Sequence, residues 1–185
     1  MEELHHFWSS ERPRRRPVRE VIVSDAHIQL EDPSYLIADL EAFVVDLMQG
    51  SKVARADFPR EALLAAAVAI YLGEAQNGGH AQVISNTEAD PVLFADIREG
   101  LALFGLDAVS DVWVRFEAYG KSQPSKFTKA DWRDPTLQAL DAALNPRLRG
   151  AYAHLADQIM RWTFLRVLPG EQAVAAREAL KADYQ

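Results

Sequence analysis

The sequence contains no cysteine, and no apolar run in it approaches the length of a membrane-spanning helix, which is ~20 residues. The lack of cysteine excludes a disulfide framework and thiolate chemistry, and it fits a reducing compartment. No apolar segment follows the arginines near the N-terminus, which argues against a signal peptide. The sequence therefore predicts a soluble cytoplasmic protein with no membrane partner.

Negative charge dominates the chain, whose formal net charge is -7. The first 20 residues hold five arginines and four glutamates, so the remaining 165 residues carry about -8. Nucleic-acid binding depends on clustered lysine and arginine, so we expect no direct nucleic-acid binding and favour a basic protein partner. The stretch from Arg12 to Arg19 is the exception. It could touch nucleic acid or the acidic body of a second subunit, and a homodimer is therefore possible.

A chain of 185 residues is long enough for one compact domain without metal or disulfide support. Residues 1–32 read as a basic arm with an extended lead-in, and residues 33–185 read as a helical domain. The valines at 18, 21 and 23 could form a short strand, but we interpret this part as ordered coil.

Apolar residues recurring at steps of three and four predict an all-α, single-domain bundle of about seven helices. Residues 63–72 are apolar almost all round, which places their helix at the centre of the core. Asn145 and Pro146 are interpreted as the start of a separate long helix that ends before Pro169. The predicted helical segments are 33–48, 59–76, 79–85, 91–104, 107–120, 136–144, 145–168 and 171–183.

An amide-rich turn with two glycines interrupts the apolar central helix. Its polar and glycine residues are Glu74, Asn77, Gly78, Gly79, His80, Gln82 and Asn86. The favoured interpretation is structural, because glycine allows positive φ and the amides can bond the backbone groups that a sharp turn leaves free. The alternative is a small-ligand or catalytic pocket, in which polar side chains from both sides of the turn converge.

This motif also carries a resemblance, because the central helix with Glu74, then Asn77-Gly78-Gly79, Gln82 and Asn86, is followed by a helix ending at Gly105. Over residues 33–168 the chain resembles the DNA-mimic-protein-like family. The resemblance implies a helical fold, no cofactor and, for at least one member, an acidic surface that imitates DNA phosphates. Two departures are His80, where the family usually has an aromatic residue, and Thr87-Glu88, which replaces a small glycine-containing turn.

The best candidate for such a surface is a set of seven carboxylates opposed by only Arg98 and Arg115, which gives a local charge of -5. The set comprises Glu88, Asp90, Asp96, Glu99, Asp107, Asp111 and Glu117. We predict a non-enzymatic interaction module whose acidic face binds a basic protein, as a DNA mimic would. The ordinary alternative is that these side chains are the solvated faces of amphipathic helices.

No constellation of catalytic residues is recognisable, and we predict no metal and no cofactor. His80 has apolar neighbours and reads as a core residue, and the acid–histidine pairs near His27 and His154 lack the three or four ligands of a zinc site. Gly120-Lys121-Ser122 imitates the end of a phosphate loop, but the preceding strand is missing. A role as an immunity or stress-response protein is a further alternative.

Overall fold

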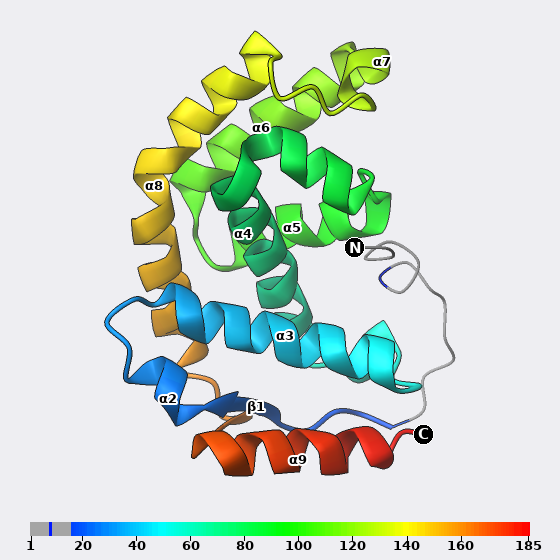
Figure 1. Ribbon diagram of the computed structural model, residues 1–185, viewed down its shortest axis with the longest axis vertical. Helices are drawn as coiled ribbons and strands as arrows, with labels where there is room; N and C mark the ends of the chain where they lie inside the picture. The colour runs from blue at the N-terminus through cyan, green and yellow to red at the C-terminus, as the bar shows by residue number, and fades with distance from the viewer. Residues whose placement is uncertain (1–7, 9–15) are drawn as a thin grey trace.

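A long helix, α4 (Arg60–Thr87), runs through the middle of the computed structural model, which describes Trp8 and residues 16–185 (Figure 1). Every residue of α4 from 62 to 72 is buried. The prediction of an all-α domain built around a central apolar helix is therefore confirmed.

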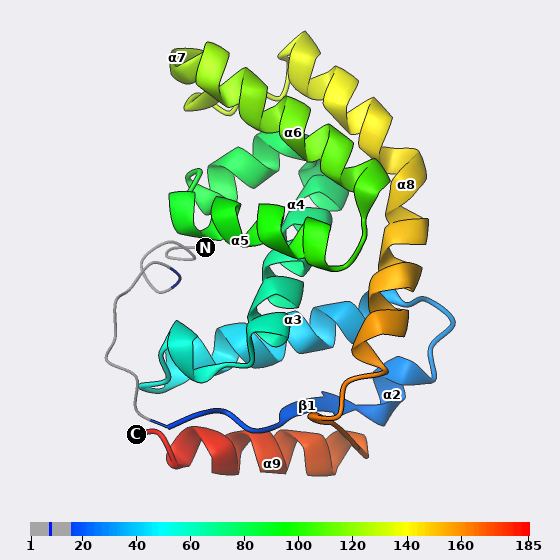
Figure 2. The same cartoon turned by 180° about the vertical axis from the view of Figure 1, so that it is seen from behind.

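Three helices cover α4: α3 (Ser34–Gly50), α5 (Pro91–Leu103) and α8 (Pro135–Ile159). The approach of α5 is very close, because a Cβ added to Gly100 would lie 2.8 Å from the carbonyl oxygen of Leu64. Figure 2 shows α5 and α6 (Asp107–Ser122) from the opposite side of the molecule. The remaining helices are α2 (Asp25–Ile28), the short 3-10 helix η1 (Arg55–Asp57), α7 (Pro124–Phe127) and α9 (Gly170–Ala182).

A small parallel sheet joins segments from the two ends of the chain. Strand β1 (Val21–Ser24) pairs with β2 (Leu165–Leu168), with Val21 opposite Leu165. β1 is buried along its whole length and packs against α3 and α9. The interpretation of residues 18–23 as ordered coil was thus wrong over β1. A strand depends on its partner, which here lies far along the chain and has a half-exposed, unremarkable pattern.

Helix α8 differs from its prediction at both of its expected boundaries. The chain continues as one helix through Pro146, so the separate helix expected to open there does not exist. Leu144 and Leu148, on either side of the proline, are both buried on the core-facing side of the helix. Their packing stabilises the continuous helix by more than the missing N–H hydrogen bond of Pro146 costs. The helix then ends at Ile159, and residues 165–168, predicted as helix, form β2.

Within the described part of the chain, no helix combines the length and the apolar character needed to cross a membrane.

Candidate functional site

The double glycine bends α4 sharply. Gly78 has φ -153° and ψ 18°, and Gly79 has φ 73° and ψ -172°, so the helix stops and restarts there. At each of the two positions a different neighbouring side chain leaves no room for a Cβ atom. A Cβ on Gly78 would lie 2.9 Å from Cβ of Gln82, and one on Gly79 would lie 2.7 Å from Cγ of Asp141. The positive φ of Gly79 also disfavours any other residue.

Asp141 of α8 caps the restarted half of α4. Its Oδ1 atom accepts a hydrogen bond from the backbone N–H of His80 at 2.8 Å and lies 2.6 Å from Nδ1 of the same residue. Because an ionised carboxylate only accepts, Nδ1 carries the ring proton. Nε2 then accepts from the hydroxyl of Tyr71 at 3.1 Å. Nothing in the sequence pattern marked Asp141, which is one of the two aspartates within α8.

The resulting chain of Tyr71, His80 and Asp141 has the order of a catalytic relay, but no substrate can reach its hydroxyl. Tyr71 and His80 are fully buried, and Trp113 and Phe116 pack against their rings. Burial and the charge of Asp141 raise the pKa of Tyr71 far above its usual value, so the hydroxyl stays protonated. The geometry suits a role in shaping the core.

The other polar residues of the motif gather around Glu74. Its Oε2 atom accepts from Nε2 of Gln82 at 2.6 Å and from Nδ2 of Asn86 at 2.8 Å. The kink thus turns two amides of the second half of α4 back toward a carboxylate of the first half. Asn77 is exposed and stays outside this group. Glu74, Gln82 and Asn86 thus converge across the turn, as the pocket alternative expected of its polar side chains, and Asn77 does not.

Glu41 of α3 faces this cluster, which the sequence did not indicate. Burial, together with the charge of Glu74, raises the pKa of the Glu41 carboxyl to about 7. Among the described residues, no hydrogen bond reaches this carboxyl, whereas Glu74 is held by two amides. Near neutral pH the Glu41 carboxyl is therefore partly protonated. The described residues contain no group of three side chains arranged to hold a metal ion.

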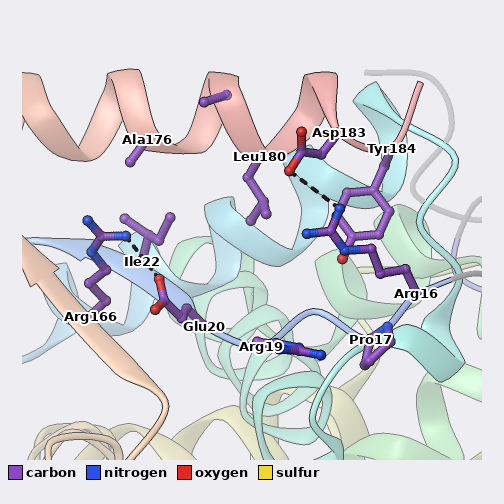
Figure 3. A pocket seen from close by; sticks show the side chains of 11 residues that line it. Arg16, Pro17, Arg19, Glu20, Ile22, Arg166, Ala176, Leu180, Asp183 and Tyr184 are labelled. Atoms are coloured by element: carbon purple, nitrogen blue, oxygen red, sulfur yellow. Dashed lines mark hydrogen bonds and ion pairs between the residues drawn. The ribbon is translucent and has the colours of Figure 1, made fainter.

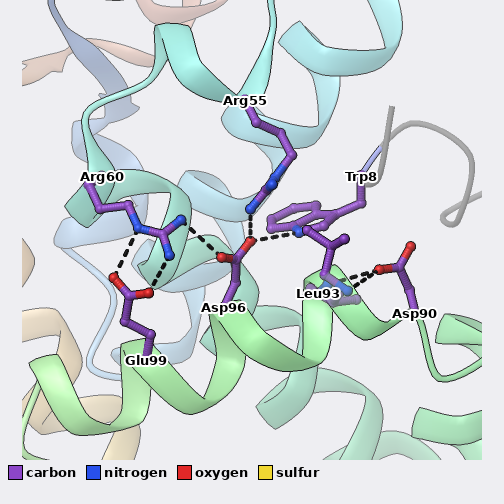
Figure 4. Close-up of polar contacts among 8 residues, drawn as sticks. Trp8, Arg55, Arg60, Asp90, Leu93, Asp96 and Glu99 are labelled. Atoms are coloured by element: carbon purple, nitrogen blue, oxygen red, sulfur yellow. Dashed lines mark hydrogen bonds and ion pairs between the residues drawn. The ribbon is translucent and has the colours of Figure 1, made fainter. Parts of the chain in front are cut away.

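The predicted acidic face is divided by internal ion pairs. Asp96 is 2% exposed and binds Arg55, Arg60 and the indole of Trp8, with the Arg60 Nη1–Oδ1 distance at 2.9 Å and the Trp8 Nε1–Oδ2 distance at 3.0 Å (Figure 4). Glu99 lies beside it and accepts from Nε of Arg60 at 3.0 Å. Asp96 is therefore a buried structural carboxylate, and its partners lie outside the segment from which the face was predicted.

Two more carboxylates of the predicted face are engaged within the protein. Asp90 is buried and caps α5, accepting from the backbone N–H groups of residues 92 and 93. Glu117 accepts from Nε of Arg98 at 3.0 Å, which joins α5 to α6. Glu88 is exposed at the C-terminal end of α4, with φ 45°.

Asp107 and Asp111 occupy the exposed side of α6, one turn apart, and within the described residues no ion pair reaches either. Val114, 56% exposed, continues the same side of the helix, and Leu103, 53% exposed, lies at the end of α5. Two carboxylates and two apolar side chains thus remain open to solvent near the junction of these helices. We call Leu103, Asp107, Asp111 and Val114 the α5–α6 surface.

A separate groove of about 410 Å³ lies between the chain entering β1 and helix α9 (Figure 3). Four of its five charged side chains are paired across the walls: Arg16 with Asp183 at 3.6 Å, and Arg166 with Glu20 at 3.0 Å. These ion pairs fasten the chain ends to each other. Of the predicted basic arm, Arg12, Arg14 and Arg15 lie outside the described residues.

Comparison with known proteins identifies a family. A family model described as DMP19-like protein matches residues 56–166, which is more than half of the chain and includes the kinked helix, α5, α6, α7 and α8. No match to the chain was found among curated proteins or among solved structures. The chain belongs to the DMP19-like protein family.

Proposed function

We propose that the protein acts by binding another protein, and that the α5–α6 surface is its contact site. The family takes its name from a DNA mimic protein, whose kind of action requires a basic, DNA-binding partner. The net charge of -7 suits such a partner, because opposite charge steers association. The expectation that the protein is not an enzyme accompanies this proposal.

The exposed side of α6 is the observation that carries the proposal. Asp107 and Asp111 have no internal partner among the described residues, so their charge is available to an incoming lysine or arginine. Val114 and Leu103 add apolar area beside them. Protein interfaces combine an apolar centre with a polar rim, and the α5–α6 surface has both parts.

This contact site is smaller than the face predicted from the sequence. Asp90 and Asp96 are buried, while Glu99 and Glu117 are each held by an arginine. The paired glutamates contribute little net charge, but their fixed positions next to the α5–α6 surface can orient a basic partner. Glu88 stays in the proposal as an exposed neighbour.

A pull-down from lysate tests the contact site. The double variant D107K/D111K is compared with E31K/E171K, which reverses two other exposed carboxylates and changes the net charge equally. We expect wild type and E31K/E171K to recover a basic DNA-binding protein at low salt, and D107K/D111K to lose it. Recovery should fall at 1 M salt, where the Debye length is about 3 Å, and DNA should compete. Equal recovery by both double variants would refute the proposed site.

The alternative of a ligand pocket at the glycine turn receives less support. Gln82 and Asn86 both donate to Glu74, and Asp141 fills the space beside Gly79. These polar groups satisfy one another, as the structural interpretation expects. The immunity or stress role, the homodimer and the cytoplasmic location stay predictions.

A further inference from the structure

The C-terminal half of α6 has the opposite charge to its beginning. Five cationic side chains lie within residues 115–133, and within the described residues none of them forms an ion pair. They are Arg115, Lys121, Lys126, Lys129 and Arg133. Of the nearby acids, Glu117 binds Arg98, and Asp134 accepts from the Tyr119 hydroxyl at 2.7 Å and caps α8. Asp131 is exposed and accepts from the backbone N–H of Arg133 at 2.9 Å. A concentration of unpaired positive charge therefore stands on an acidic protein.

Two of these cations line a groove of about 560 Å³ between α6, α7 and the start of α8. Arg115 and Lys126 face it from different helices, and no acidic side chain is part of its lining. Gln123 adds an amide donor, while Tyr119 and Leu140 supply apolar area. The hydroxyl of Ser122 is already used, since it donates to the carbonyl of Tyr119 at 3.1 Å. The free donors are a guanidinium, an ammonium and an amide, which suit phosphate oxygens.

A large aromatic side chain, Trp132, is exposed in the loop that leads to α8. It lies four residues before Thr136, which lines the groove, and its ring is 65% exposed. The guanidinium of Arg133 lies over the ring, 4.6 Å from its centroid. An exposed indole beside cations is the combination by which proteins stack bases while holding the phosphate backbone.

We propose that this groove binds the phosphate groups of a nucleotide or of a short single strand of nucleic acid. Arg115 and Lys126 contact phosphate oxygens, and Trp132 offers its ring to a base. Lys121, Lys129 and Arg133 each lie within three residues of a lining residue along the chain, and their charge favours a strand with several phosphates over a single nucleotide. This site differs from the α5–α6 surface and stands independently of the proposed partner, and it amends the expectation of no direct nucleic-acid contact drawn from overall charge.

Fluorescence anisotropy of the full-length protein tests the site, with a fluorescein-labelled dT12 strand and a fluorescent ATP analogue as probes. R115E and K126E are compared with R161E, which makes the same charge change at an exposed arginine outside the groove. We expect each groove variant to weaken binding about tenfold or more, and R161E to have a small effect. If the strand contacts only the two groove cations, a plot of the logarithm of the binding constant against the logarithm of the salt concentration should have a slope of about -1.4.

The two probes distinguish a nucleic-acid strand from a single nucleotide as the source of the phosphate. Much tighter binding of dT12 identifies a strand, and equal binding of both probes identifies a nucleotide. If neither probe binds at 50 mM salt, the proposal is overturned. Equal weakening of binding by R161E and by the groove variants would overturn it too. Competition by polyglutamate as effective as that by unlabelled dT12 would also overturn it, since phosphate would then have no advantage over carboxylate.

Discussion

The carboxylate of Asp141 occupies the space that the missing side chain of Gly79 leaves open. One residue gives up its Cβ, and the other uses the room to cap the second half of α4. This pairing, rather than a bound ligand, explains why the turn needs glycine at its second position.

Gly79→Ala should lower the free energy of unfolding by about 2 to 4 kcal/mol, because it adds a positive-φ penalty to a clash with Asp141. Gly73→Ala is the matched control. Gly73 lies on the same helix with nothing within 4 Å of an added Cβ, so the change should be neutral or stabilising by up to about 1 kcal/mol. Urea unfolding measures both, and equal destabilisation would contradict the explanation.

Asp141→Ala should cost about 2 to 3 kcal/mol of stability, since the backbone N–H and the ring of His80 lose their shared acceptor. Asp157→Ala, at an exposed position on the same helix, should stay within about 0.5 kcal/mol of wild type. Thermal unfolding followed by circular dichroism distinguishes the two. A loss at Asp157 as large as that at Asp141 would mean that the cap adds nothing.

Glu41 should make the protein less stable as pH rises. Its pKa is about 7 in the folded protein against 4.5 in the unfolded chain, so the folded state holds the extra proton between these values. Stability should therefore fall from pH 4.5 to 7, by roughly 2 kcal/mol after allowance for the partial exposure of the side chain.

Glu41→Gln removes the titrating carboxyl. The stability of the variant relative to wild type should therefore rise by the same amount between pH 4.5 and 7. Glu31→Gln, at an exposed position, serves as the control and should leave the pH profile unchanged. Urea unfolding at intervals of pH follows the effect. Parallel profiles for Glu41→Gln and wild type would show that the carboxyl titrates normally.

Asp96→Asn should destabilise the protein by about 2 kcal/mol, because the partly buried Arg55 and the exposed Arg60 would lose their shared buried carboxylate. Glu99→Gln acts on the same arginine cluster from an exposed position and should cost less than about 1 kcal/mol. Chemical unfolding again gives the measurement. If the two changes cost the same, Asp96 would be better described as part of the open acidic surface.

The local sequence pattern predicted the helices well, because the spacing of apolar residues that defines the buried face of a helix lies within the helix's own segment. The prediction failed where a distant segment decided the outcome. Val21–Ser24 becomes a strand only beside Leu165–Leu168, and α8 passes Pro146 because the core continues on both sides.

The same division applies to the candidate site. Glu74, Gln82 and Asn86 lie on the two sides of one turn, so their positions indicated that they could converge across it. Asp141 and Arg55 come from other elements, and nothing in their own sequence context marks them as the partners of His80 and Asp96. The charge of the predicted acidic face was therefore overestimated, since Arg55 and Arg60 come from outside the segment that was counted.

The β1–β2 pairing also affects how the protein is made. Val21 meets Leu165 only after the ribosome has synthesised 144 further residues, so β1 can pack against α3 early but its pairing edge stays open until β2 has emerged. A nascent chain stalled before β2 would leave the backbone groups along this edge of β1 unpaired and open to strand pairing with other chains.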